Sequence, residues 1–213
     1  MTSEACEYLS NRCEVMRRLI REHGPCMLVL NGRRTPFESL VRAVAHQQLH
    51  ASAAESILAR FVALFGTGRF PTPQRFATVS DDAVRACGFS RAKTAALRDI
   101  AEKTLSGVVP GPRAIGKMSD EEIIERLIQV RGVGRWTVEM LLISTLGRPD
   151  VLPVDDFGVR NGIRIAFGLK EMPRPRELAA YAQPWRPYAT TAVWYLWRAA
   201  DQSGKKKAAM AEA

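Results

Sequence analysis

The sequence contains a short turn whose residue types suit the binding of phosphate groups. Residues 130–134 read Val-Arg-Gly-Val-Gly and lie between two helical patterns. Glycine adopts positive φ angles easily and leaves no side chain between the backbone and a ligand. Amide groups at the start of the following helix can then meet a phosphate, helped by the helix dipole. One glycine usually suffices for an ordinary helix–helix turn, so the two glycines favour a hairpin whose backbone amides bind phosphate. Its predicted contact residues are Gly132, Val133, Gly134, Arg131 and Arg135.

Two adjacent aspartates, Asp155 and Asp156, follow at the expected start of another helix. One aspartate at such a position ordinarily caps the helix by accepting a hydrogen bond from a backbone N–H of the first turn. We assign this capping role to Asp155, which leaves Asp156 as a carboxylate able to do chemistry. The residues alone favour a purely structural role for both aspartates.

The composition of the 213 residues is that of a globular protein with excess positive charge. The formal net charge is +9, and arginine supplies most of it. Such a protein favours nucleic acid as its partner, and an anionic membrane is the weaker alternative because no apolar run approaches the length of a bilayer span. The N-terminus does not resemble a secretory signal, and the four cysteines lack metal-binding or redox spacing. We therefore expect a cytoplasmic protein with reduced thiols, no catalytic metal and no cofactor.

Helical patterns run through the whole chain, and no segment shows sustained strand-like alternation. Helix starts are indicated by Thr35-Pro36, Thr72-Pro73, Ser80 and Ser119, and six glycines mark helix ends. We predict an all-α fold of about ten helices in two lobes over residues 1–203, with the active site in the cleft between the lobes, and a flexible basic tail over 204–213. The expected helices are 4–22, 36–47, 51–65, 81–86, 91–106, 120–129, 135–146, 156–167, 175–183 and 187–200, with a short helical turn at 73–77.

The hairpin and the aspartates together resemble the helix-hairpin-helix DNA glycosylase superfamily, in particular the bacterial 3-methyladenine DNA glycosylase II type. The resemblance covers roughly residues 36–200. It rests on the hairpin and on the segment 150–160, and also on 41–44 with Gln47-Gln48, on 70–75, and on Val193-Trp194-Tyr195. The chain has no room for the α/β domain with which the larger bacterial enzyme begins, so we expect a compact, all-helical form.

The resemblance implies that Asp156 is the catalytic aspartate of a base excision repair enzyme. Such an enzyme would flip alkylated purines out of damaged double-stranded DNA and hydrolyse the bond to the sugar, leaving an abasic site. Relatives with lyase activity carry a lysine where this sequence has Trp136, so the resemblance implies a monofunctional enzyme. An alkylated purine is positively charged, and an aromatic face attracts such a ring. The implied base pocket contains Trp136, Trp194, Tyr195, Met140 and His46, although His46 is equally well explained as a structural residue.

The resemblance also assigns a wedge that fills the space left by the flipped base. Gln48 matches the intercalating residue, with Leu49 as its neighbour, and both lie between two expected helices. In the family a monovalent cation binds hairpin carbonyls, which would here be those of Ile128, Val130 and Val133. We expect a monomer that associates with the bacterial nucleoid when it is on DNA.

Two alternative functions remain open from the sequence. One is a glycosylase for mismatched or other damaged bases on the same fold. The other is a non-catalytic helix-hairpin-helix protein that only binds DNA, although such a protein would not need Asp156. A soluble helical adaptor with a basic face would explain neither the hairpin nor its spacing from the aspartate.

Overall fold

The computed structural model describes residues 3–211, and all regular secondary structure in this range is helical. It contains thirteen α-helices and one 3₁₀ helix, with no strand among the described residues. The predicted all-α class is therefore confirmed. None of the described helices is both long enough and apolar enough to cross a membrane.

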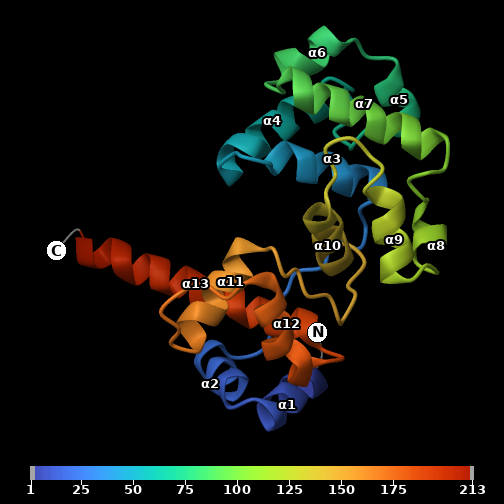
Figure 1. The fold of residues 1–213 in the computed structure, drawn as a ribbon. Coiled ribbons are helices and arrows are strands. Elements are labelled where there is room, and N and C mark those ends of the chain that lie inside the picture. Colours follow the sequence, from blue (N-terminus) through green and yellow to red (C-terminus); the bar gives the residue numbers. More distant parts are fainter. Residues whose placement is uncertain (1–2, 212–213) are drawn as a thin grey trace. The chain divides into compact units, whose positions relative to one another are not determined.

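The chain divides into two compact units, in line with the two predicted lobes (Figure 1). Unit 1 combines the N-terminal segment up to Leu30 with the segment from Leu142 onward, and unit 2 is Asn31–Leu141. The boundary falls within helix α10, Arg135–Ser144. Each unit has its own core, and the predicted cleft between the lobes stays a prediction.

Unit 2 is built around a cluster of phenylalanine rings. The ring of Phe61 is buried and lies 5.4–5.8 Å from four other rings, those of Phe65, Phe70, Phe76 and Phe89. These side chains come from helices and turns across the first half of the unit, so the cluster joins its elements into one core. The helices are α3 (Pro36–His46), α4 (Ala51–Ala63), α5 (Pro73–Ala77), α6 (Asp81–Ala86), α7 (Arg91–Leu105), α8 (Pro112–Ile115) and α9 (Asp120–Leu127).

Unit 1 packs N-terminal helices against C-terminal ones, and the blue and the orange-to-red helices of Figure 1 lie side by side. Its closest helix pair is α11 and α13. A Cβ atom at Gly162 would lie 2.2 Å from the carbonyl oxygen of Leu196, so only glycine permits this approach. The helices are α1 (Ser3–Arg12), α2 (Glu14–His23), α11 (Phe157–Ala166), α12 (Pro175–Ala182), the 3₁₀ helix η1 (Gln183–Trp185) and α13 (Ala189–Ala211).

Most predicted helix ends are confirmed because local chemistry sets them. Ser119 and Glu122 form a full reciprocal capping box, and the side chains of Thr35, Thr72 and Ser80 each accept an amide hydrogen bond. All six glycines predicted to end helices have positive φ angles: Gly24, Gly66, Gly88, Gly107, Gly147 and Gly168.

Three predictions about the helices are wrong. The single helix expected over 4–22 is two helices, because Cys13 has an extended backbone conformation and starts a new helix. The short helix α8 was not predicted at all. Helix α13 continues to Ala211, past residue 200, where we expected the last helix to end. The last two residues of the predicted tail, 212–213, lie outside the described residues.

Candidate functional site

In unit 1, Asp156 is both the cap of a helix and a buried carboxylate. It stands directly before α11, and its Oδ1 accepts hydrogen bonds from the Val159 amide at 2.7 Å and from the Trp197 indole Nε1 at 2.9 Å. The residue is only 8% exposed. The assignment of the cap to Asp155 is therefore wrong: Asp155 lies in the preceding turn and is exposed, because α11 begins at Phe157.

The packing of α11 against α13 places Trp197 beside this carboxylate. A Cβ atom at Gly158 would lie 2.9 Å from Trp197 Cδ1 and 3.1 Å from Asp156 Oδ1. Gly158 and Gly162 are four residues apart and so share one face of α11. Together they allow α13 to come close enough for the indole to donate its hydrogen bond.

The loop leading to Asp156 is fixed by a buried threonine. Thr190 Oγ1 donates to the Arg148 carbonyl at 2.7 Å and accepts from the Val151 amide at 2.9 Å. Further along, the Asp156 amide donates to the Pro153 carbonyl at 3.0 Å. These bonds define where the loop ends and α11 begins, so they help to set the position of the carboxylate.

Both aromatic residues predicted for a base pocket in unit 1, Trp194 and Tyr195, are buried. Trp194 is 8% exposed, packs edge-to-face against Tyr195 and has the Arg198 guanidinium 5.6 Å from its ring centroid. The structure corrects the prediction that Tyr195 lines the pocket. Its side chain is fully buried, and its hydroxyl donates to the Gly24 carbonyl at 2.8 Å. Burial raises the pKa of Tyr195, and the neighbouring Cys6 adds to this effect. Tyr195 is a core residue.

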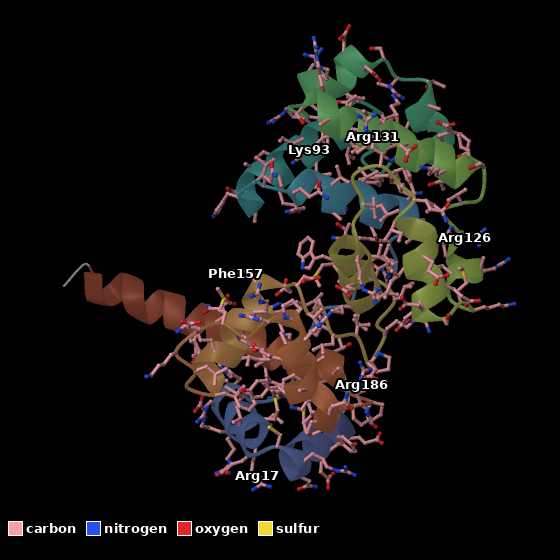
Figure 2. The ribbon with its side chains drawn as sticks, in the orientation of Figure 1. Arg17, Lys93, Arg126, Arg131, Phe157 and Arg186 are labelled. Atoms are coloured by element: carbon pink, nitrogen blue, oxygen red, sulfur yellow. The ribbon has the colours of Figure 1, made fainter. Side chains whose placement is uncertain are left out.

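Two aromatic residues near Asp156 were missed by the sequence reasoning. Trp197 is not among the pocket residues predicted from the sequence, yet it hydrogen-bonds the carboxylate directly. Phe157, labelled in Figure 2 at the start of α11, was not considered and is 67% exposed. A large apolar ring directly after the candidate catalytic residue was a signal available in the sequence.

In unit 2, side chains of helix α7 hold the backbone of the glycine hairpin. Asp99 Oδ2 accepts from the Arg131 amide at 2.6 Å and from Lys103 Nζ at 2.8 Å, and Lys103 also donates to the Gln129 carbonyl. Burial opposes ionisation of Asp99, but the bonds from Lys103 and Arg131 outweigh it and lower the pKa of this carboxyl. The hairpin is thus anchored at its backbone by two α7 side chains.

The hairpin itself agrees only in part with the prediction. Gly132 has a φ of +75°, and the Val133 amide donates to the Val130 carbonyl at 3.0 Å. Gly134 does not have a positive φ; a Cβ atom there would meet open space. Gly132 is therefore required by the backbone conformation, whereas Gly134 only keeps the surface of the turn uncovered.

Arg135 was expected to contact phosphate, but it is engaged by two carboxylates. Its guanidinium lies 3.1 Å from Glu121 Oε1 and 3.2 Å from Glu139 Oε1. The bond to Glu121 is the main cause that raises the pKa of Arg135. Because these pairs offset its charge, the arrangement argues against Arg135 as a main phosphate ligand and leaves Arg131, exposed on the hairpin, as the candidate cation.

The predicted wedge lies at the tip of a strained turn between α3 and α4. The Leu49 amide donates to the His46 carbonyl at 3.3 Å, Gln47 has φ −56° and ψ 129°, and Gln48 has φ +55°. These angles define a type II turn, which normally carries glycine or asparagine at its third position. A left-handed conformation costs a residue such as glutamine about 1–2 kcal/mol. Both Gln48 and Leu49 are exposed, as expected of a wedge.

The remaining pocket candidates lie in unit 2. Trp136 is the second residue of α10 and is 43% exposed, and Met140 one turn later is half-buried. His46 Nε2 lies 2.9 Å from Glu55 Oε1 and so links α3 to α4, which favours the structural interpretation of this histidine.

The chain is helical and combines a glycine hairpin, an exposed wedge turn and a carboxylate at a helix start. These features are typical of proteins that bind the backbone of nucleic acid. Comparison with known families defines this class further: the chain belongs to the HhH-GPD superfamily of base excision DNA repair proteins, whose pattern matches residues 41–187. The superfamily match spans the hairpin, the wedge turn and Asp156.

Individual relatives agree with this membership. DNA-3-methyladenine glycosylase 1 of Schizosaccharomyces pombe is 45% identical over 166 residues, covering 78% of this chain and 73% of that protein. The fission yeast 3-methyladenine DNA glycosylase solved in complex with abasic DNA has a TM-score of 0.86 and 42% identity, covering 92% of this chain and 96% of that one. A DNA-3-methyladenine glycosidase from Bacillus halodurans has a TM-score of 0.84 and 32% identity, covering 96% and 92%.

Proposed function

We propose that the protein is a monofunctional DNA glycosylase that removes alkylated purines, of the 3-methyladenine and 7-methylguanine class, by hydrolysis. The observation that carries this proposal is the carboxylate of Asp156, buried at the start of α11 and oriented by Val159 and Trp197. The similarity of the chain to relatives named as 3-methyladenine DNA glycosylases supports the substrate class. Trp136 stands where a lysine would be needed for a Schiff base, which supports hydrolysis without lyase chemistry.

Asp156 would act on the sugar rather than on the base. Breaking the bond between the sugar C1′ and the purine nitrogen leaves its electron pair on the purine and builds positive charge on the sugar ring. A fixed carboxylate stabilises that charge more than the neutral sugar of the ground state, so it lowers the barrier. Water then adds to C1′ and loses a proton, giving an abasic site. The burial of Asp156 strengthens the electrostatic effect because little water screens it.

The proposed substrates are good leaving groups because alkylation gives the purine ring a positive charge. A ring of this kind leaves as a neutral base, so the site does not need a strong general acid. Aromatic faces attract such a cation. The candidates for stacking are the exposed rings of Trp136 and Phe157, together with Trp194, which is only 8% exposed. This provides selectivity for alkylated over normal purines.

The DNA backbone would be held mainly by the hairpin in unit 2. The turn at Gly132, with exposed Gly134 and the cation Arg131, is suited to a phosphate. The carbonyls of Ile128, Val130 and Val133 are neutral oxygen donors that suit a monovalent cation, which would add positive charge near that phosphate; Val130 already accepts one amide and has a second lone pair. We propose that the protein acts as a monomer on double-stranded DNA in the bacterial cytoplasm.

Base release from alkylated duplex DNA tests this function. The wild-type protein should release 7-methylguanine and 3-methyladenine, measured by chromatography, without cleaving the DNA strand. Asp156→Asn should lose most of the activity while still binding an abasic-site duplex. Asp155→Asn is the matched control, because it removes the same charge one residue away from an exposed position, and it should keep normal activity. Near-normal release by Asp156→Asn, or no release by the wild type, would overturn the proposal.

A further inference from the structure

The turn that carries Gln48 is held by a lysine from a different helix. Lys93, near the start of α7, directs its Nζ to two backbone carbonyls, those of Ala45 at 2.8 Å and Gln47 at 2.7 Å. Figure 2 labels Lys93 in unit 2. Burial lowers the pKa of Lys93, as is usual for an ammonium group partly withdrawn from water. Lys93 therefore bonds both the end of α3, at Ala45, and the wedge turn, at Gln47.

The Gln47 carbonyl is the group that distinguishes the two common forms of this turn. Type I and type II turns differ mainly by a flip of the central peptide, here the one between Gln47 and Gln48. In type I, Gln48 would have a negative φ and no strain. In type II, Gln48 has the observed φ of +55°, and the Gln47 carbonyl points to the opposite side. A flip to type I would turn this carbonyl away from Lys93 and break the 2.7 Å bond.

A second contact acts in the same direction. Gln47 Nε2 donates to the Gly132 carbonyl at 2.9 Å, and so fixes the side chain of the turn to the hairpin. The hairpin is in turn anchored to α7 through Asp99. The wedge turn and the hairpin are therefore both supported by helix α7. The strained conformation of Gln48 is restrained by the bond from Lys93 and by the bond from Gln47 to the hairpin.

We propose that Lys93 is a positioning residue that holds the wedge turn in its strained type II form, so that Gln48 is presented to the DNA before binding. Strained backbone persists only where its surroundings enforce it, and Lys93 is the group that enforces this conformation. With the turn preformed, DNA binding need not select a rare conformer, which would otherwise weaken insertion. The inference rests on the proposed function, since it concerns the residue that fills the space left by the flipped base.

The test compares Lys93→Met with wild type on duplex and on single-stranded alkylated DNA. A single strand has no base stack for a wedge to enter. Lys93→Met should therefore lower the excision rate on duplex about tenfold, the loss expected for one hydrogen bond to a carbonyl, while the rate on single strands changes less than about twofold. Lys117→Met is the matched control: it removes the same charge from an exposed position of unit 2 and should leave the ratio of the two rates unchanged.

A double-mutant comparison separates positioning from general damage. If Lys93 acts through Gln48, then adding Lys93→Met to Gln48→Ala should cause little further loss on duplex. Equal losses on duplex and single strand, or full additivity in the double variant, would overturn the proposal. A crystal structure of Lys93→Met in which Gln48 keeps a positive φ would do so as well.

One readout does not depend on base release and keeps the two proposals apart. An abasic-site duplex with 2-aminopurine opposite the gap should change in fluorescence when Gln48 enters the stack, and Lys93→Met should weaken that change. A wild-type protein that gives the fluorescence change but releases no base would refute the glycosylase function while leaving the role of Lys93 intact. The reverse result, base release with a fluorescence change insensitive to Lys93, would refute only the positioning role.

Discussion

The hydrogen bond from Trp197 to Asp156 can be removed, while an aromatic ring is kept, by Trp197→Phe. Phenylalanine keeps an aromatic ring in the gap between α11 and α13 but has no N–H to donate. Asp156 would keep the amide bond from Val159 and lose the 2.9 Å bond from the indole. A hydrogen bond to a charged group contributes about 1.5–3 kcal/mol. Because the carboxylate is only 8% exposed, water replaces the lost donor poorly.

If the full loss appears in the transition state, the rate falls roughly tenfold to a hundredfold. The indole donates its hydrogen bond to Asp156 itself, so the effect should fall on kcat rather than on KM. The assay is single-turnover release of 7-methylguanine from a defined duplex. Binding to an abasic-site duplex should stay within about twofold of wild type, since the hairpin is unchanged.

The control for this substitution is Trp185→Phe. Trp185 is fully buried in unit 1, and its Nε1 has no hydrogen-bond partner among the described residues. Its replacement creates a small cavity that lowers stability by about 1–3 kcal/mol, yet no bond to Asp156 is lost and kcat should be unchanged. If Trp197→Phe retains wild-type kcat, or if both variants lose activity in proportion to their stability, the positioning of Asp156 by Trp197 is refuted.

Three further predictions follow from packing and charge. Gly162→Ala places a Cβ atom 2.2 Å from the Leu196 carbonyl and should lower the free energy of unfolding by about 3 kcal/mol or more; a thermal denaturation midpoint equal to wild type would contradict this. Gly132→Ala strains a φ of +75° and crowds Ala96 at 3.1 Å, so abasic-duplex affinity measured by fluorescence anisotropy should fall several-fold, and unchanged affinity would count against the hairpin. Because the pKa of Asp99 lies below its ordinary value of 3.8, the ionised group stabilises the fold above that pH, and this contribution is lost as pH falls through the lowered pKa. Asp99→Asn should therefore weaken the dependence of the free energy of unfolding on pH, measured by urea unfolding. An equally steep loss of stability at low pH in the variant would show that Asp99 is not its source.

Local chemistry explains why the helices were largely predictable. A serine or threonine cap and a glycine with positive φ act within one turn, so the sequence carries the information directly. The break at Cys13 lacked such a signal, because its side chain makes no capping hydrogen bond. The position of the cap before α11 was displaced by one residue, since two adjacent aspartates satisfy the same rule and the Pro153 turn decides between them.

The sequence indicated the hairpin, the wedge turn and Asp156 as candidates for the site, but not the contacts that support them. Successive helical residues are rotated by 100°, so Tyr195 and Trp197 point in nearly opposite directions along α13. Only the packing partner decides which ring enters the core and which faces Asp156. The pairing of Arg135 with Glu121 is likewise a tertiary contact between two helices, and it was not visible from spacing.

The N-cap role of Asp156 also bears on how substitutions at this position can be interpreted. Asparagine is as good an N-cap as aspartate, whereas alanine at such a position costs about 0.5–2 kcal/mol of helix stability. An alanine variant would therefore lose activity through two routes at once, loss of the charge and fraying of the first turn that carries Phe157 and Gly158. The asparagine variant keeps an acceptor for both Val159 and Trp197 and removes only the charge. Inactive proteins at this position can thus remain well folded and DNA-bound, which makes the asparagine form suited to trapping the complex with an intact damaged base.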